Sequence, residues 1–357
     1  MRYWVGLCLF ILSLPLSAVQ VEGLYTAQVV VDDQSQALRN KAIAVAFNLV
    51  LQKASGRTSV LQSPLLQAET PKFSSYVEQF QYQQMADEQT GYLLKISFQK
   101  TAIDRFLQRL DVPVWGSNRP DILVWLSLEQ AGRVQLVGAD SEQWAPRLTQ
   151  IALDSGLMIT LPLLDLVDQQ AISTDNVWQA SAESIELASQ RYGAQQVMVA
   201  RLMSSSNASK QFDWKLINTS GEYVDALRAD TLEVAFRSGL AKMSERLADI
   251  YAPRGSSAET ELSIVLRGVN TLEQFIDVTQ YLSSLDMVKK LDWKNMRIGT
   301  LELQLNISGD EAVFKKIVAL NHVLLPDAAE VQTVATMVDG EVQIEQGLSR
   351  TLYYRIN

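Results

Sequence analysis

The sequence has one cysteine, Cys8, and one histidine, His322. Because Cys8 lies in an apolar N-terminal stretch, the rest of the chain can form no disulfide, which argues against small disulfide-stapled modules. Structural zinc sites usually need four nitrogen or sulfur ligands, which the chain cannot supply. A Ser-His-Asp triad would have to use His322, and the Gly-x-Ser-x-Gly motif of serine hydrolases is absent. We interpret His322 as a residue of a helix end or of the surface.

Signatures of nucleotide and nucleic-acid binding are also absent. Neither Gly-x-x-x-x-Gly-Lys nor Gly-x-Gly-x-x-Gly occurs. The net charge is −9, from 31 basic and 40 acidic residues, and no stripe of Lys and Arg is interleaved with aromatic residues. A nucleic-acid partner is therefore not expected. We expect no cofactor.

Only one long apolar run occurs, from Tyr3 to Leu14. Arg2 precedes it, and Pro15 and the small residue Ala18 follow it. A positive start, a short apolar core and small residues at the exit are typical of a secretory signal peptide, which we place at residues 1–20. The run is shorter than the about 20 residues of a membrane-spanning helix, and an uncleaved anchor is the alternative. We expect a periplasmic protein with no stable membrane span after cleavage.

The composition indicates an ordinary globular body, with 47% hydrophobic and 20% charged residues. After the signal about 340 residues are left, enough for two or three domains. A turn-rich segment with Pro113, Gly116 and Pro120, and a linker of Pro, Gly and Ser over 252–258, divide them. These boundaries predict an N-terminal module at 21–115, a central domain at 116–252 and a C-terminal module at 259–357.

The first and third modules show the same predicted order of strand, helix, strand, strand and helix. In the first, Asp32, Asp33 and Ser35 offer cap oxygens to a long helix that Ser55-Gly56 ends. In the third, residues 301–307 alternate strictly between apolar and polar, which predicts a strand with one wet face. Such units are typical of split-βαβ, ferredoxin-like sandwiches.

Details of the third module are also predicted. Asn270 and Glu273 resemble a capping box, and Asp310 is a cap for a final helix. The alternation near 352–356 leaves open whether the tail packs as a strand or hangs free.

The central segment alternates strands with helices and predicts an α/β domain. Its apolar run ILVWLSL, residues 122–128, predicts a strand covered on both faces. Residues 133–137 are expected to pair back onto it through Gly132. Helices are expected at 143–153, 177–189 and 232–250, and further strands at 197–203 and 212–216. The predicted fold is thus α+β and α/β, with two small modules flanking a central α/β domain.

Four segments carry a resemblance to a known family: VVVDDQSQALRNKAIAVAFNLVLQKASG, RPDILVWL, ASQRYGAQQVMVARL and FDWKL. In this order they resemble the secreted proteobacterial family called domain of unknown function 2066 (DUF2066), over most of the chain after the signal. The resemblance implies a periplasmic protein of Gram-negative bacteria without an established activity. RYGAQQVMVARL and the Trp-bearing strand after it are distantly similar to the amino-terminal domain of the Tol translocation protein B. The first segment is similar to the amino-terminal domain of flagellar assembly protein T. Both likenesses imply docking modules.

Carboxylate chemistry stays open, because two acids suffice for glycoside hydrolysis. Asp165 and Asp168 follow an apolar run, where a strand-end site of an α/β domain would lie. Glu183 and Glu186 lie one turn apart on an expected helix. The structural interpretation of all four is that they are solvated or cap helices.

Among the aromatic residues, Trp115 lies in the turn-rich junction, and we expect it to be partly exposed and to favour an interface. The candidate surface or ligand site is therefore Asp165, Asp168 and Trp115. No catalytic or metal-binding residue is assigned.

The leading hypothesis from the sequence is a non-enzymatic scaffold or adaptor of the cell envelope with an envelope protein as partner. One alternative is a carboxylate-dependent glycan hydrolase. Another is a periplasmic protein that binds a small ligand at the strand ends of the central domain.

Overall fold

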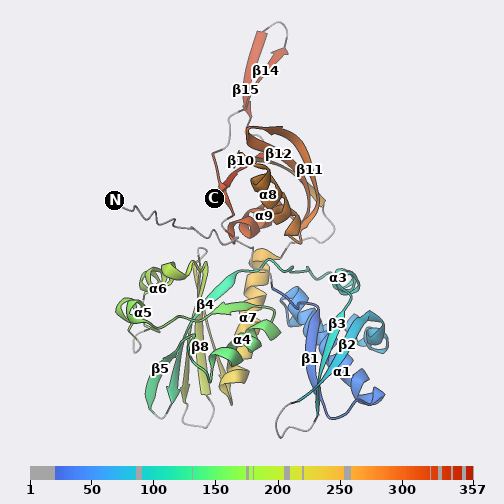
Figure 1. Cartoon of the computed structure of the whole chain (residues 1–357), viewed down its shortest axis with the longest axis vertical. Coiled ribbons are helices and arrows are strands. Elements are labelled where there is room, and N and C mark those ends of the chain that lie inside the picture. Colours follow the sequence, from blue (N-terminus) through green and yellow to red (C-terminus); the bar gives the residue numbers. More distant parts are fainter. Residues whose placement is uncertain are drawn as a thin grey trace, which may run out of the picture.

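The computed structural model describes residues 21–85, 91–130, 132–173, 177–179, 181–204, 210–218, 221–252, 259–321, 323–328, 332–338, 341–347 and 351–356. This part of the chain forms a mixed α+β structure with sheets of three, six and five strands and a separate two-stranded hairpin. Figure 1 shows the modules of these sheets grouped around one helix, α7, with the five-stranded module at the top. The predicted fold class is confirmed.

The N-terminal module is a three-stranded antiparallel sheet with helices on one face. Its elements are β1 (Thr26–Val31), α1 (Gln36–Ser55), η1 (Ser59–Gln62), α2 (Pro64–Glu69), η2 (Thr70–Tyr76), β2 (Val77–Gln84), β3 (Tyr92–Phe98) and α3 (Lys100–Arg109). The strand order is β1-β3-β2. Ser35 caps α1 by accepting from the Leu38 amide, and Gly56 ends it in the left-handed conformation, as the sequence predicts. Phe47 stacks on Phe73 in the core.

The central module is a six-stranded sheet covered on both faces. Its elements are β4 (Asp121–Gln130), β5 (Arg133–Val137), α4 (Ala145–Asp154), β6 (Met158–Thr160), α5 (Leu166–Ala171), α6 (Ala182–Ser189), η3 (Gln190–Tyr192), β7 (Gln196–Ser204), β8 (Lys210–Asn218), β9 (Gly221–Ala229) and α7 (Leu232–Tyr251). The strand order is β5-β4-β7-β8-β9, and β6 also pairs with β4. Along β4, Ile122 and Val124 pack with the core of α4 and α7, whereas Leu123 and Trp125 pack with the core of α6. The predicted two-sided burial of this strand and its pairing with 133–137 are confirmed.

One helix of the central module differs from the prediction. The helix expected over 177–189 begins at Ala182, where the Ser181 side chain accepts from the Ser184 amide. Val177 is buried in the core but lies in a turn. Val177 is therefore apolar because it packs in the core, and not because it belongs to the apolar face of a helix. The short helix α5, capped by Asp165, was not predicted.

The C-terminal module repeats the topology of the first. Its elements are β10 (Glu259–Val269), α8 (Leu272–Ser284), β11 (Val288–Arg297), β12 (Gly299–Ser308), α9 (Glu311–Ala319), β13 (Leu324–Pro326) and β16 (Thr351–Ile356). The order β11-β12-β10 matches β2-β3-β1, with the same antiparallel directions. The shared order that the sequence predicts is therefore present in the two sheets.

The rest of this sheet departs from a four-stranded ferredoxin-like arrangement. β16 lies between β10 and β13, parallel to β10 and antiparallel to β13. The tail after Asp327 thus returns to the sheet as a strand, which decides the question that the sequence leaves open. Along the chain, the hairpin of β14 (Gln332–Val338) and β15 (Glu341–Gly347) connects β13 to β16. It projects at the top of Figure 1.

The caps of the C-terminal helices refine the sequence analysis. Asp310 caps α9 by accepting from the Val313 amide, as predicted. The capping box of α8 is formed by Thr271 and Gln274, one residue later than the predicted Asn270 and Glu273. The Asn270 side chain instead donates to the carbonyl oxygen of Gly268, at 3.1 Å.

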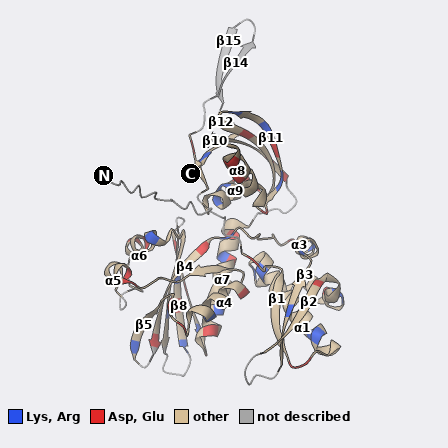
Figure 2. Cartoon of the chain, viewed as in Figure 1, with Lys and Arg blue, Asp and Glu red and all other residues tan. Residues whose placement is uncertain are grey.

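Charged residues of both signs are interspersed over the three modules in Figure 2. Among the described residues, no helix combines the length and apolar character that crossing a bilayer requires.

Candidate functional site

The two predicted aspartates lie together in an ion-pair cluster of the central module. Asp165 caps α5 by accepting from the amides of Val167 and Asp168, each at 3.1 Å. Its two oxygens also accept from the Arg191 guanidinium, at 2.7 and 2.9 Å. These hydrogen bonds, with the Arg191 bond the strongest cause, lower the pKa of Asp165 to about 2. Asp165 is therefore held as a charged cap.

Asp168 is buried in the same cluster. Its carboxylate accepts from the Tyr192 hydroxyl at 2.5 Å, from the Leu164 amide at 2.8 Å and from Arg191 at 3.2 Å. Burial and the bond to Asp168 raise the pKa of Tyr192. The cluster pins α5 to η3 through carboxylates whose oxygens already have partners. Asp165 is thus a helix cap, whereas Asp168 is buried and is not the residue that caps the helix. Glu183 and Glu186 are exposed on α6.

Trp115 is not part of this cluster. It is 1% exposed, so the expectation of a partly exposed tryptophan is wrong. The residue packs between modules, where its amide donates to the Ala54 carbonyl at 2.7 Å and its ring lies against Gly56 at the end of α1. The turn-rich sequence around Trp115 suggests a surface loop, but the segment lies where the modules meet.

Arg119 is the buried centre of this junction, and sequence reasoning missed it. Its guanidinium lies 4.0 Å from the Trp115 ring centroid. It donates to the carbonyl oxygens of Lys53 and Trp115 at 2.6 Å, of Gly156 at 2.7 Å and of Gly116 at 2.9 Å. Lys53 belongs to the last turn of α1, and Gly156 follows α4. One cation thus holds the carboxyl ends of two helices from different modules, where helix dipoles favour positive charge.

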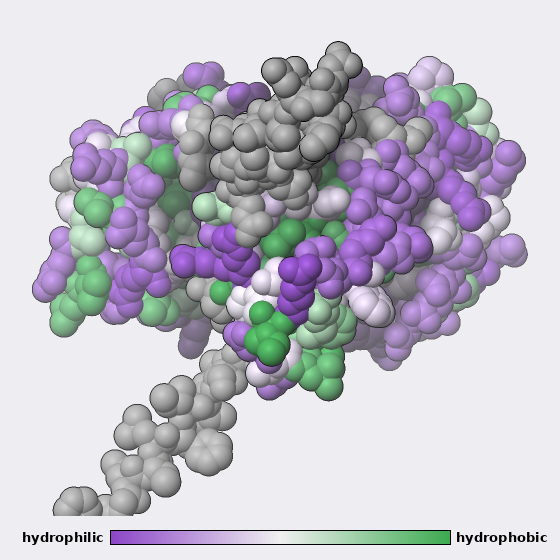
Figure 3. All heavy atoms as spheres, turned by 90° about the horizontal axis from the view of Figure 1, so that it is seen from above, coloured by the Kyte–Doolittle hydropathy of each residue, from purple (hydrophilic) through white to green (hydrophobic). Residues whose placement is uncertain are grey.

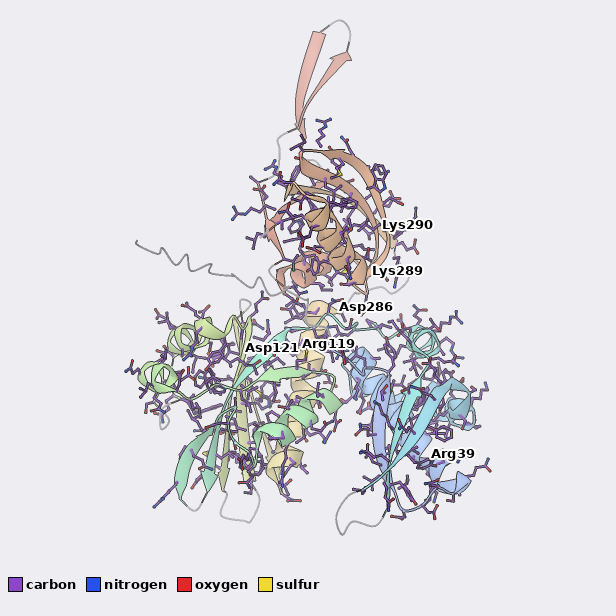
Figure 4. The ribbon with its side chains drawn as sticks, in the orientation of Figure 1. Arg39, Arg119, Asp121, Asp286, Lys289 and Lys290 are labelled. Carbon is purple, nitrogen blue, oxygen red and sulfur yellow. The ribbon has the colours of Figure 1, made fainter. Side chains whose placement is uncertain are left out.

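The C-terminal module contacts the same segment through Asp286, in the turn after α8. Its carboxylate accepts from the Ser117 amide at 2.5 Å and the Ser117 hydroxyl at 2.7 Å, and it lies 3.4 Å from the Lys100 ammonium. Figure 4 shows Asp286 above Arg119 at the point where the modules meet. Burial alone would raise the pKa of Asp286, but the Ser117 hydrogen bonds and the charge of Lys100 lower it below 3.8.

A cavity of about 370 Å³ lies at this junction, and residues of all three modules line it. Lys100 and Asp104 come from the first module, Tyr251 from α7, and Glu259 and Asp286 from the third. Lys100 is paired with Asp104 at 3.1 Å as well as with Asp286. One ion pair of the cavity wall, between Lys100 and Asp286, therefore joins the first and third modules.

Acid is expected to weaken this contact. Because Asp286 has a lowered pKa in the folded state, its stabilising contribution is present above its ordinary pKa of 3.8 and is lost as the pH falls through the folded value. We expect Asp286→Asn to lower the free energy of unfolding at neutral pH, and the difference from the unmodified chain to shrink below about pH 4. Urea unfolding across this range measures it. Asp292→Asn, on an exposed carboxylate, is the control. A difference that does not depend on pH would contradict the expectation.

A second feature is an exposed apolar surface on the C-terminal module. The end of β10, the start of α8 and the turn between β11 and β12 meet at one end of this module, since Val269 pairs with Gly299 and Arg297 with Thr300. Ile298, in this turn, is 99% exposed, and Trp293, further along β11 opposite Leu303, is 68% exposed. We call the following residues the C-terminal apolar surface: Leu272, Ile276, Trp293, Met296 and Ile298. In the view from above, Figure 3 shows hydrophobic residues exposed next to the grey atoms near its centre.

The sequence around Trp293 carries one signal for this surface. Trp293, Met296 and Ile298 stand among Lys294, Asn295 and Arg297 in the segment WKNMRIG, without the apolar neighbours that the core strands have. Within the described ranges, no group of three or more His, Cys, Asp or Glu is placed to hold a metal ion. His322 lies outside the described residues.

Comparisons with known proteins give a partial assignment. Residues 18–116 match the family described as Domain of unknown function (DUF8605). The resemblance of the longer chain to domain of unknown function 2066 stays a prediction, because the match is to a different family and covers the N-terminal module. No curated protein matches.

Solved structures of two bacterial proteins are similar to part of the chain. The LpoB C-terminal domain from Salmonella enterica is 15% identical, with a TM-score of 0.23, over 36% of this chain and 92% of that one. Lipoprotein GNA1162 from Neisseria meningitidis is 8% identical, with a TM-score of 0.22, over 36% of this chain and 97% of that one. TM-scores this low carry no conclusion about function.

Proposed function

We propose that this chain is a non-enzymatic scaffold or adaptor of the cell envelope, which works in the periplasm by binding another protein. The observation that carries the proposal is the C-terminal apolar surface. Trp and Met are enriched in protein interfaces, and an exposed Trp is the residue type that most often dominates binding energy. The signal-like residues 1–20 and the absence of cysteine after Cys8 support the compartment.

The junction supports this role in a second way. Arg119 and Asp286 join the modules through hydrogen bonds and an ion pair. These contacts fix the orientation of the C-terminal module and of its apolar surface. A preorganised surface loses less conformational freedom on binding than a flexible one. The two predicted aspartates support a non-enzymatic role, because Arg191 and Tyr192 already occupy their oxygens.

Site-specific photocrosslinking in cells tests the proposal. A photoreactive residue at Ile298 is expected to trap a defined envelope protein, whereas one at Leu187, 60% exposed on α6, should not trap the same protein. Trp293→Ala should weaken the complex by about tenfold or more, since truncation of a central Trp costs about 2 kcal/mol or more. Because Trp293 is exposed, its replacement should leave the melting temperature nearly unchanged. Equal adducts at both positions, or none at Ile298, would contradict the proposal.

A further inference from the structure

The edge strands β2 and β11 occupy the same place in the repeated unit. Each is the second strand of its module and, among the strands that the structure describes, pairs on one side only, β2 with β3 and β11 with β12. The register of β11 with β12 shifts twice. β11 also has four basic residues: Lys289, Lys290, Lys294 and Arg297. Lysines and bulges are the means by which proteins keep an edge strand from pairing with another chain. β11 is therefore a protected edge.

β2 lacks this protection. Its sequence VEQFQYQQ has one charged residue, Glu78. After a shift at its start, the register with β3 runs without a break from Gln79 to Gln84. Phe80 is 47% exposed, and the side chains of Gln81 and its glutamine neighbours are exposed as well. A regular edge strand with little charge is a template for another strand.

The backbone of β2 also presents hydrogen-bonding groups at its outer edge. The Met85 amide donates to the Gly91 carbonyl at 3.4 Å, which turns the backbone of the odd-numbered residues 79–85 toward β3. Because successive residues of a strand direct their N–H and C=O groups to opposite sides, Phe80, Tyr82 and Gln84 direct theirs outward. No other strand among the described residues pairs there.

We infer that this edge pairs with β2 of a second copy of the chain, antiparallel and about a two-fold axis at Gln81. The segment Gln79-Phe80-Gln81-Tyr82-Gln83 has the same chemical pattern in both directions, with amides alternating with aromatic rings. A two-fold interface brings one surface against itself. Centring on Gln81 therefore sets Phe80 opposite Tyr82 of the second copy, and glutamine opposite glutamine.

Charge and ring contacts fit this register. Tyr82 is in edge contact with both Phe80 and Tyr92, with ring centroids 6.0 Å apart in each pair. Pairing with a second copy continues this aromatic row across the interface, where such cross-strand pairs stabilise a sheet. Glu78 falls opposite Gln84, so that no two like charges face each other. The Arg39 guanidinium lies 5.2 Å from the Phe80 ring centroid, at a position far from the junction in Figure 4.

The contact is small, which sets its expected strength. An edge of about seven residues buries less than the ~1,200 Å² at which stable interfaces begin, so the dimer should be weak, with a dissociation constant of about a micromolar or more. Because the pairing strand and the C-terminal apolar surface belong to different modules, this inference does not depend on the proposed function.

Cysteine crosslinking tests the register. In a chain with Cys8→Ser, oxidation of Gln81→Cys is expected to give a covalent dimer, because the facing residues form the close, non-hydrogen-bonded type of pair, with Cα atoms about 4.5 Å apart. Gln79→Cys is the matched control in the same strand. The two copies of residue 79 are offset by four residues, more than about 10 Å, and should not bridge. Equal crosslinking of both variants, or of neither, would overturn the inference.

Sedimentation velocity of the unmodified chain tests the same inference without a thiol. We expect the average mass to rise with concentration, up to about 100 µM for a weak dimer. Gln81→Lys sets two lysines opposite each other and should return the chain to a monomer, with an unchanged melting temperature because the side chain is exposed. A chain that is monomeric throughout, or a dimer that persists in Gln81→Lys, would refute the pairing.

Discussion

Replacing Arg119 with methionine is expected to lower the free energy of unfolding by about 3–5 kcal/mol. The guanidinium is buried and donates to four carbonyl oxygens, on Lys53, Trp115, Gly116 and Gly156. Methionine fills much of the same volume but leaves these acceptors without a donor. A buried carbonyl that loses its partner costs about 1–3 kcal/mol. Urea unfolding measures the loss.

Two further variants separate charge from geometry. Arg119→Lys keeps the charge but replaces a planar fork by three donors on a flexible stem, so it should recover only part of the stability. Arg237→Met is the control, because Arg237 is half exposed and its ion pair with Asp154 is 3.6 Å long. Its cost should be below about 0.5 kcal/mol. Equal stability of Arg119→Met and Arg237→Met would show that water or a local shift satisfies the four carbonyls.

Gly56→Ala is expected to lower the free energy of unfolding by about 3 kcal/mol. The residue has a φ of +69°, where an L side chain is strained. An added Cβ would also lie 2.5 Å from the Cε3 atom of Trp115 and 2.9 Å from the Cβ atom of Ala248. Alanine therefore adds backbone strain at this position. Its Cβ atom would also push the end of α1 away from Trp115 and from α7.

The chain offers a matched control for the backbone part of this effect. Gly193 has a φ of +64°, and nothing lies within 4 Å of a Cβ added there. Gly193→Ala should therefore cost only the left-handed strain, about 1–2 kcal/mol. The difference between the two variants, measured by urea unfolding, gives the steric cost at the junction. If Gly56→Ala and Gly193→Ala cost the same, the close approach of Trp115 is not limiting.

The elements with a local signal could be predicted from the sequence. The run ILVWLSL specifies a strand buried on both faces, because no polar residue interrupts it before Ser127. The alternation around Leu303 specifies a strand with one wet face, and the side chains of Ser35 and Asp310 mark helix starts. These features depend on neighbours within a few residues along the chain.

The junction could not be predicted in this way. Arg119 has the sequence context of a loop, and its burial depends on carbonyl groups of two helices that lie on either side of it in the sequence. Trp115 was predicted to be partly exposed for the same reason. Conversely, Trp293 is exposed because it lies on an edge strand beyond the helices that cover the sheet, and its polar neighbours in WKNMRIG are the only local sign of this. Whether such a residue is buried depends on how the modules pack against one another and on which strands lie at the edge of a sheet.

The place of β16 has a consequence for the order in which the chain folds during synthesis. β10 leaves the ribosome early in the C-terminal module, but the strand that pairs with its second edge is made of residues 351–356. The N-terminal sheet, in contrast, is complete once β3 has been made. The five-stranded sheet therefore closes only after nearly all of the printed sequence has been translated, and until then β10 can pair with β12 alone while its second edge is open. The C-terminal module therefore stays incompletely folded for longer during synthesis than the N-terminal module does.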